Sequence, residues 1–429
     1  MEYLLPRTAS RRALWSMGFN QVLTSLQTQS YMPVIPLVMT TDMHLPAVWS
    51  GVCFFGMVFA SLISLGAMTV LIKKYPPRGL IAYAYVLRAF SGVLWIVGTS
   101  RSLVLVVLCR FVYGLTLATF TFPLIWVSVK LPPEERPQAS AMVMGLLLMG
   151  IVNGPIIGDL IAAWLGYSAV GFMTVGLSSI QLAVHLLFFD DHTLLLSSSQ
   201  PNAKPDDKAV IKLSGLKCFY DFMMGMGLLS GFEATMSLQV RDAYGWGIEE
   251  SWRAWVCFGA FQIICSLIIN PVLLKKLNSA QCATVSFVVS FGSLLGVNWI
   301  DLSEPIPAWL FLVDGFFCNA YVLCSMSIQG RIATVVPQEM QTGVNTAAAM
   351  AGQLGRAFGP IVISGLYDFV CAKIPGPGTG ANFSRVYMML VAGIPLWLCI
   401  IGFFELCFGR FSDSSPEALQ RQAGKTALV

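Results

Sequence analysis

The most restrictive feature of this chain is that apolar stretches of about 20 residues follow one another along nearly its whole length. A helix of about that length crosses the hydrocarbon core of a bilayer. Charged residues make up only 11% of the chain, less than half the share of about 25% that is usual in a globular domain. Because so few charges cannot cover a water-soluble body of this size, the sequence predicts an all-α membrane protein.

The composition also excludes several other classes of protein. A net charge of +4 is too small to indicate a nucleic-acid partner. The 11 cysteines lie mostly inside apolar stretches, no Cys-x-x-Cys pair occurs, and there are only 3 histidines, so we expect neither a metal site nor a cofactor. The motifs of serine hydrolases, zinc proteases and phosphate-binding loops are missing from the sequence, and we therefore expect no enzyme activity.

The apolar stretches divide into two groups of six, separated by one polar segment. That segment, residues 190–212, is rich in serine and lysine and shows no apolar periodicity, as is typical of a linker. About twelve transmembrane helices fit the length of the chain, with the fourth expected at 103–129 and the tenth at 306–335. The expected parts are an N-terminal six-helix bundle in 1–189, a cytoplasmic linker in 190–212, a C-terminal six-helix bundle in 213–410 and a cytoplasmic tail in 411–429.

The distribution of basic residues predicts the orientation of the chain in the membrane. Most of the 26 Lys and Arg residues fall in loops on the side of the two termini and the linker, and that side is expected to be cytoplasmic. The loop at 371–383 then lies on the opposite side, where Asn382, Phe383 and Ser384 form a glycosylation acceptor. The first apolar stretch follows Arg11 and Arg12 and is too long and polar for a cleavable signal peptide, so we interpret it as span one.

Two six-span halves joined by a cytoplasmic linker resemble the major facilitator superfamily, and several motifs strengthen the resemblance. The motifs of spans four, five and eleven are similar to superfamily signatures, whereas the two clusters of span seven resemble the lysosomal branch typified by ceroid-lipofuscinosis neuronal protein 7. The residues concerned are Arg110, Gly114 and Ala118; Pro133 to Arg136; Gly150, Gly154, Pro155 and Gly158; Gly355 to Pro360 and Gly365 to Tyr367; and, in span seven, Phe232 to Thr235 and Asp242 to Trp246.

The resemblance implies two pseudo-symmetric six-helix bundles and a secondary transporter that works by alternating access. Its partners would be the lipid bilayer and a small-molecule or ion substrate, and we expect a monomer without a nucleic-acid partner. The membrane would be endolysosomal, vacuolar or plasma membrane. In this superfamily spans one, four, seven and ten are expected to line the central cavity.

Three of those four spans carry an ionisable residue: Arg110, Glu233 and Asp314. A charge at the centre of a membrane helix costs roughly 2.5 to 3.5 kcal/mol on insertion scales, so it must face a partner or water. We interpret the three residues as substrate contacts in the cavity. Glu233 and Asp314 are also candidates for proton coupling, because a carboxylate can avoid burial as an ion by taking up a proton. Structural ion pairing is the alternative for Arg110, and an interfacial position is the alternative for Asp314.

Other charged residues also lie within the predicted spans, among them Arg88, Arg356 and Asp159. Arg88 is expected to be bonded inside the first half of the chain, because span three is normally peripheral. Arg356, with Gly352, Gly355 and Gly359 around it, is either a clamp between helices or a contact for an anion. Asp159 is expected near a span end, either solvated or paired there.

Span one has a polar face at helical spacing. Gln21, Thr24 and Thr28 recur along it with Tyr31 beside them. We interpret them as cavity-lining residues, with interhelical hydrogen bonding as the alternative.

Gly and Pro residues predict where helices can bend during transport. Gly154 and Pro155 in span five, and Gly359 and Pro360 in span eleven, are the gating candidates.

The leading hypothesis is a carrier for a small anionic or zwitterionic solute, with possible proton coupling at Glu233. Two alternatives come from other classes: an endolysosomal anion (chloride) channel, since arginine-lined pores conduct anions, and a membrane receptor that does not transport.

Overall fold

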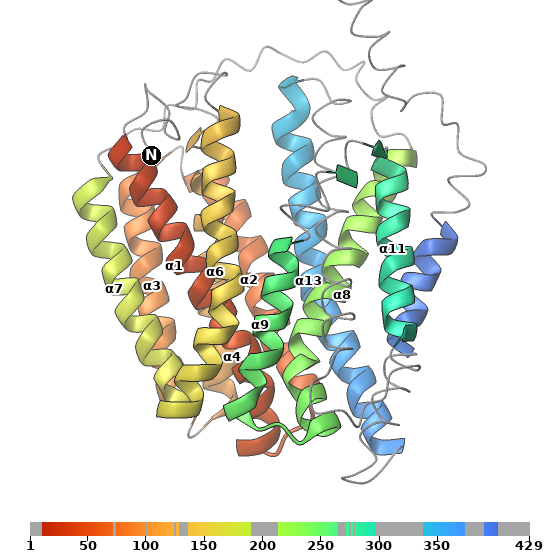
Figure 1. Cartoon of the computed structure of the whole chain (residues 1–429). Coiled ribbons are helices and arrows are strands. Elements are labelled where there is room, and N and C mark those ends of the chain that lie inside the picture. Colours follow the sequence, from red (N-terminus) through yellow and green to blue (C-terminus); the bar gives the residue numbers. More distant parts are fainter. Residues whose placement is uncertain are drawn as a thin grey trace, which may run out of the picture. The chain divides into compact units, whose positions relative to one another are not determined.

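The computed structural model confirms the predicted all-α fold. Its described residues are helical, with turns and bends between the helices and no strand among them (Figure 1). Several predicted features lie outside the described residues: the tenth span, Asp314, the linker at 190–212, the tail at 411–429 and Asn382. The count of twelve helices therefore stays a prediction. The structure describes residues 11–71, 74–99, 102–123, 126–127, 136–189, 213–264, 272–273, 276–277, 279–296, 338–373 and 390–401.

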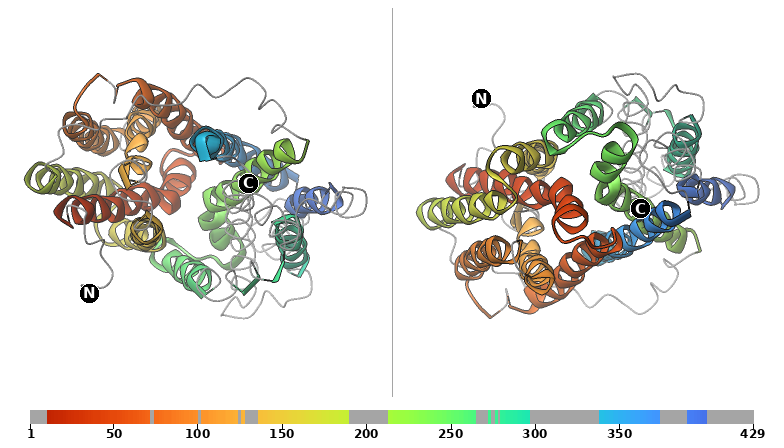
Figure 2. Two further views of the ribbon diagram at one scale, coloured as in Figure 1. Left: turned by 90° about the horizontal axis from the view of Figure 1, so that it is seen from above. Right: turned by 90° about the horizontal axis from the view of Figure 1, so that it is seen from below.

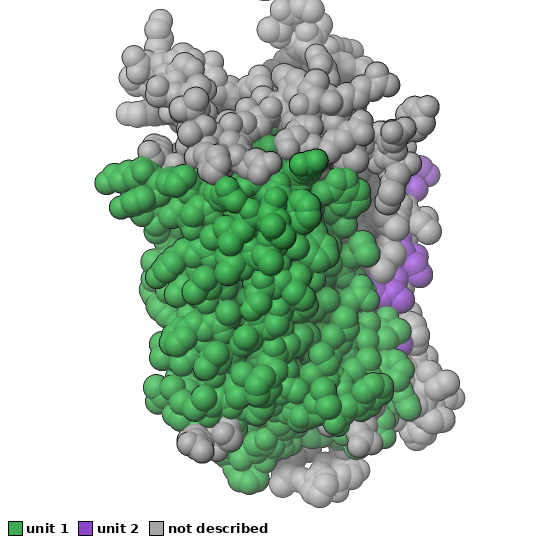
Figure 3. All heavy atoms as spheres, turned by 90° about the vertical axis from the view of Figure 1, so that its left-hand side faces the viewer, with its two compact units in different colours: residues 1–201, 230–256, 356–369 green, residues 202–229, 257–355, 370–429 purple. Residues whose placement is uncertain are grey.

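The chain divides into two compact units, which Figure 3 shows in different colours. Unit 1 contains the helices of the first half together with segments of three later helices. Unit 1 comprises Met1–Pro201, Ser230–Val256 and Arg356–Phe369, and unit 2 comprises Asn202–Leu229, Cys257–Gly355 and Val370–Val429.

Six α-helices from the first half build most of unit 1. Figures 1 and 2 show α1 beside α6 and α7, and contacts also join α3 to α7 and α2 to α4. These helices are α1 (Arg11–Leu37), α2 (Val48–Leu71), α3 (Pro77–Gly98), α4 (Leu103–Leu115), α6 (Arg136–Leu165) and α7 (Ser168–Phe188). The later helices are α8 (Leu213–Tyr244), α9 (Ile248–Ile264), α11 (Ser279–Gly296) and α13 (Gln338–Lys373), followed by a short apolar helix at Leu390–Ile401.

Length and hydropathy mark these helices as membrane-spanning. Within the described residues, five helices are long and apolar enough to cross a bilayer. Large apolar side chains such as Tyr83, Val104 and Phe172 are exposed on them. Apolar surface of this extent is unfavourable in water and expected in lipid, because lipid tails are as apolar as the side chains themselves.

Small residues allow α1 and α6 to pack closely. A Cβ atom on Gly154 would lie 2.6 Å from the Cβ of Gln29, and one on Gly158 would overlap the carbonyl oxygen of Ser30. Pro155 lies inside α6 and Pro360 inside α13, and both helices continue through their prolines. The gating role of the two Gly-Pro pairs therefore stays a prediction.

The predicted fourth span is not one continuous α-helix. Helix α4 ends at Leu115 and is followed by a 3₁₀-helix, η3 (Leu117–Phe120). Hydroxyl groups explain the change, because Thr116 donates to Tyr113 O (2.7 Å) and Thr119 donates to Thr116 O (2.8 Å). Threonine side chains that bond to nearby carbonyls compete with the regular helical pattern.

Helix α1 also changes its winding at its end. It runs through Pro33 and Pro36 and is followed by a π-helix, η2 (Val38–Asp42). Short π segments inside a helix are frequent at functional sites. In this chain the π-helix lies at the end of unit 1 where α6 also ends (Figure 1), and Thr41 Oγ1 lies 3.5 Å from the hydroxyl of Tyr167.

Candidate functional site

Arg88 of α3 is bonded inside the first half of the chain, as predicted. Its side chain is fully buried and donates to Thr24 Oγ1 (2.6 Å), Thr119 Oγ1 (2.9 Å) and Thr116 Oγ1 (3.1 Å). It also donates to Thr116 O and Gln181 Oε1, both at 3.3 Å. All of these partners are uncharged, so Arg88 is held by a hydrogen-bond network and not by an ion pair.

Arg88→Ala should therefore destabilise the protein. Removing the guanidinium leaves buried hydroxyl and amide oxygens without their donor, and each such group costs about 1 to 3 kcal/mol. We expect a lower midpoint of thermal unfolding in detergent, followed by intrinsic fluorescence. Arg12→Ala is the matched control, because Arg12 is exposed on α1. Equal midpoints for the two variants would contradict the structural role of Arg88.

The polar face of α1 makes hydrogen bonds to neighbouring helices. Gln21 Nε2 donates to Phe120 O (3.1 Å), Thr28 Oγ1 bonds to the hydroxyl of Tyr113 (3.0 Å), and Tyr31 bonds to Thr174 Oγ1 (2.8 Å). Interhelical bonding, which is the alternative from the sequence, is thus present for these side chains and for Thr24. Their direct contact with a substrate stays a prediction.

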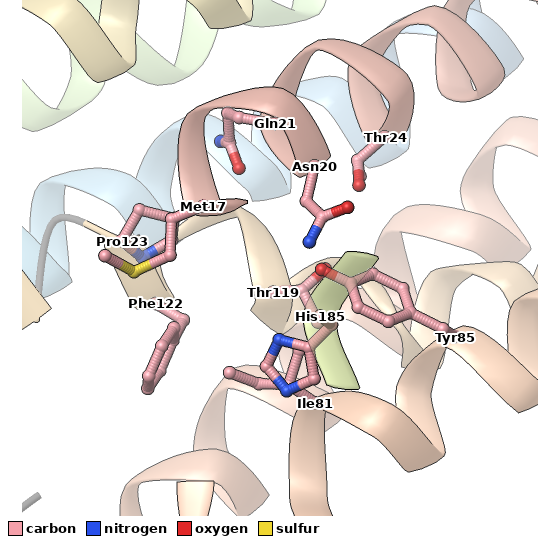
Figure 4. A pocket seen from close by; sticks show the side chains of 10 residues that line it. All are labelled: Met17, Asn20, Gln21, Thr24, Ile81, Tyr85, Thr119, Phe122, Pro123 and His185. Carbon is pink, nitrogen blue, oxygen red and sulfur yellow. The ribbon is translucent and has the colours of Figure 1, made fainter. Parts of the chain in front are cut away.

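A small cavity lies beside this polar face (Figure 4). Asn20, Gln21 and Thr24 of α1, Tyr85 of α3 and His185 of α7 contribute to its lining. Its volume of about 10 Å³ is close to the space that one water molecule needs. Asn20 Oδ1 is buried and has no hydrogen-bond partner, so a water is the ligand that this cavity fits.

Arg110 of α4 is fully buried in an aromatic environment. Its guanidinium carbon lies 4.7 Å from the ring centre of Tyr31, 5.3 Å from that of Tyr113 and 5.9 Å from that of Phe54. Nη2 contacts Met57 Sδ at 2.6 Å, whereas Nε and Nη1 have no hydrogen-bond partner. Cation–π contacts offset part of the cost of burying the charge, and the contact of Arg110 with a substrate stays a prediction.

Glu233 of α8 is paired with Arg356 of α13. Glu233 is only 4% exposed, and its Oε2 lies 4.0 Å from Arg356 Nη2, beyond hydrogen-bond distance. Glu233 Oε2 and the hydroxyl of Ser237, one turn further along α8, are buried without a hydrogen-bond partner. Arg356 is the more exposed member of the pair.

Two of the predicted site residues, Glu233 and Arg356, lie close together in the structure. In the sequence Glu233 is an isolated charge in its apolar stretch. The fold places α13, which carries Arg356, next to α8, although the two helices are far apart in the chain. Within the described residues, no hydrogen bond or ion pair joins Arg110 to Glu233 or to Arg356. The structure therefore brings two of the predicted site residues together, and Arg110 forms a separate buried cation.

Asp159 of α6 corrects an expectation. Its carboxylate is fully buried, so it is not solvated, and among the described residues it has no ion-pair partner. It accepts a hydrogen bond from Ser251 Oγ of α9. Its other oxygen, Oδ1, has no partner. The sequence places this aspartate directly after Gly158 and gives no sign that a serine 92 residues away will meet it.

Other polar groups gather at the same end of unit 1. Both carboxylate oxygens of Asp368 accept backbone N–H groups, those of Ala47 and Val48 at 2.8 Å each, and so cap the start of α2. Arg241 forms an ion pair with Asp242 (2.8 Å) and donates to Thr40 Oγ1 (2.8 Å). Asp242 in turn accepts a hydrogen bond from the hydroxyl of Tyr367.

Tyr167 lies among these groups, in the turn between α6 and α7. Burial raises the pKa of its phenol above the usual value, and the carboxylates of Asp42 and Asp159 raise it further. The Thr41 hydroxyl and the charge of Arg241 act in the opposite direction. Tyr167 is therefore neutral at physiological pH.

Apolar membrane helices with charged side chains buried among them are typical of membrane transporters. A family model described as Major Facilitator Superfamily matches residues 17–360. The chain belongs to this superfamily, whose members are transporters of small molecules and not enzymes. A comparison with curated proteins found no match.

Several solved transporters share this fold. A bacterial homologue of the human lysosomal transporter Spinster, inward-facing and unoccupied, matches with a TM-score of 0.71 and 13% identity, covering 93% of this chain and 97% of its own. The nucleoside transporter NupG matches with a TM-score of 0.70 and 13% identity over 91% of this chain and 99% of its own. The human organic anion transporter MFSD10 (TETRAN) has a TM-score of 0.63 and 14% identity over 93% and 100% of the two chains.

Proposed function

We propose that this secondary transporter moves a small anionic or zwitterionic solute by alternating access, and that Glu233 couples the movement to protons. The observation that carries this proposal is the pair of Glu233 and Arg356, two opposite charges 4.0 Å apart without a hydrogen bond between them. A buried pair of this kind is weakly held, because the cost of removing both charges from water is offset only by good geometry and additional hydrogen bonds.

The geometry suggests how a proton and an anion would act together. Ionised Glu233 neutralises the charge of Arg356. Protonation of Glu233 removes that interaction and leaves a guanidinium that can bind the carboxylate or phosphate of a solute. Proton and anion would therefore bind cooperatively, which favours transport of both in the same direction.

Other predicted residues would complete the substrate site. Arg110 would provide a second cationic contact, with Gln21, Thr24, Thr28 and Tyr31 as polar contacts on span one. Asp314 would serve as a second carboxylate. Anionic substrates are also in keeping with the similarity in fold to MFSD10, which is an organic anion transporter.

The remaining expectations concern the setting of the protein. We propose a monomer with cytoplasmic termini and two six-helix bundles in 1–189 and 213–410. The membrane would be that of an endolysosomal or vacuolar compartment, as in the lysosomal branch that span seven resembles, or the plasma membrane.

Reconstitution of the purified chain in liposomes tests the proposed function. A panel of small organic anions and zwitterions is offered with and without an inward proton gradient. We expect saturable uptake that the gradient accelerates and that solute on the opposite side stimulates. Single-channel anion currents would instead support the channel, and no flux of any kind would support the receptor.

The role of Arg110 is tested by comparing it with Arg88. Arg110→Ala should weaken solute binding by about 10- to 100-fold, because a hydrogen bond to a charged group is worth about 1.5 to 3 kcal/mol. Arg88→Ala should change binding less, since the partners of Arg88 already occupy its guanidinium. Binding is measured by titration calorimetry and expressed per folded protein. Equal losses in the two variants would count against Arg110 as a substrate contact.

A further inference from the structure

Unit 1 contains a second buried carboxylate, that of Asp159, and unlike Glu233 it has no cationic partner among the described residues. The residue is 0% exposed, and among the described residues no Lys, Arg or His forms an ion pair with it. Oδ2 has one partner, the hydroxyl of Ser251, and Oδ1 has none. Asp159 lies on α6 in the first half of the sequence and Ser251 on α9 in the second, so this hydrogen bond joins the two halves.

The charged and titratable groups around Asp159 do not neutralise it. Tyr167, in the turn before α7, interacts electrostatically with Asp159, with Asp42 of η2 and with Arg241 of α8. Arg241 is already engaged by Asp242 and Thr40.

Two described ionisable side chains of α9 near Ser251, those of Glu250 and Arg253, contact other groups. Glu250 accepts the backbone N–H of Gly247, and Arg253 lies over the ring of Trp246 at 5.9 Å.

Asp368, at the same end of unit 1, is a carboxylate whose two oxygens both have hydrogen-bond partners. Each of its oxygens accepts a backbone N–H group at the start of α2. Helix starts favour negative charge, and this position suits a carboxylate. Among the described residues, Asp159 caps no helix start and pairs with no cation, and its Oδ1 has no hydrogen-bond partner.

Burial of an ionised carboxylate without a cation is strongly unfavourable, whereas a neutral carboxylic acid needs only ordinary hydrogen bonds. The α6–α9 contact is therefore compatible with Asp159 in its protonated form. Loss of that proton would favour any rearrangement that lets water reach Oδ1, and separation of α9 from α6 is the simplest such rearrangement.

We propose that Asp159 is a further proton-binding residue of this transporter, in addition to Glu233, and that proton binding at Asp159 closes the contact between α6 and α9 made through Ser251. This inference rests on the proposed proton-coupled cycle, in which Glu233 would serve the substrate site and Asp159 the closure of one end. Acidification on the side where α6 and α7 meet would then promote closure there.

Infrared spectroscopy of the full chain in nanodiscs tests proton binding without any solute. Spectra recorded across a pH series show the carbonyl stretch of each protonated carboxylic acid, which disappears when the group ionises. We expect Asp159→Asn to remove one such band and Glu233→Gln to remove a different one. Asp368→Asn, the matched control, should remove none. A band pattern in Asp159→Asn that equals the wild-type pattern would overturn the proposal.

Hydrogen–deuterium exchange at the start of α9 tests the closure. After correction for intrinsic exchange, the wild-type rate should rise with pH by up to about tenfold per unit, the limit for one linked proton. In Asp159→Asn the exchange rate should stay low across the pH series, because the asparagine side chain is neutral at every pH. In Asp368→Asn the exchange rate should keep the pH dependence of the wild type. Ser251→Ala, which leaves the carboxylate in place, should exchange fast even at low pH.

Persistence of the pH-dependent exchange in Asp159→Asn, or slow exchange of Ser251→Ala at low pH, would overturn the proposal. Neither measurement uses a solute. A failure to detect proton-driven uptake would therefore count against the proposed function and leave the result for Asp159 unchanged.

Discussion

Glu233→Gln is expected to abolish accumulation of the solute against its gradient while leaving solute exchange intact. Glutamine has the shape of protonated glutamic acid and cannot release a proton, so one half of the coupled cycle is lost. With one proton carried per solute, a gradient of about one pH unit supports about tenfold accumulation. The variant should accumulate none, whereas wild-type protein should approach that limit.

Proteoliposomes with an imposed pH gradient provide the measurement. Glu250→Gln is the matched control, because Glu250 lies outside the pair and accepts only the N–H of Gly247. We expect the control to accumulate solute as the wild type does. Gradient-driven accumulation by Glu233→Gln would remove this residue from the coupling mechanism.

The second large effect concerns the partner of Glu233. Arg356→Gln should weaken binding of the anionic solute by about 10- to 100-fold at every pH, since a hydrogen bond to a charged group contributes about 1.5 to 3 kcal/mol. Glu233→Gln should act in the opposite direction. It frees Arg356 permanently, so that the solute binds as tightly at neutral pH as the wild type binds it under acidic conditions.

Calorimetric titration of both single variants and the double variant separates these effects. If Glu233 and the solute compete for Arg356, the gain from Glu233→Gln disappears once Arg356 is replaced, and the two changes are not additive. Additive changes would mean that Glu233 acts on binding without Arg356. Thermal unfolding of each variant shows whether a loss of binding reflects a loss of folded protein.

The sequence was sufficient to predict the class of the molecule and much of its helical organisation. Apolar stretches of about 20 residues admit few structures in a membrane, because every backbone polar group must be bonded within the chain. Spans three, five and six, which the sequence predicts near 79–98, 138–163 and 167–189, were accordingly close to helices α3, α6 and α7. The break in the fourth span was missed, although Thr116, Thr119 and Thr121 lie there, because the hydroxyl bonds that tighten the helix depend on local geometry.

The candidate site was predictable only as a set of residue types. Arg88 and Arg110 are both single arginines in apolar helices, yet the first has five hydrogen bonds and the second lies among aromatic rings with two nitrogens unbonded. The resemblance to the superfamily implies that span three is peripheral, and this implication led to the prediction that Arg88 has its partners inside the first half of the chain. The sequence contained no signal for the aromatic neighbours of Arg110, which come from three different helices.

Hydropathy is a local property that can be read along the chain, and it was enough to predict that charged side chains are buried in a bundle of membrane helices. Which of those charges meet depends on how the helices pack. Glu233 lies beside Arg356, Asp368 caps the start of α2, and Asp159 accepts a hydrogen bond from Ser251. The physical reason is that the energy of a buried charge depends on atoms within a few ångströms of it, and those atoms are supplied by helices that are distant in the sequence.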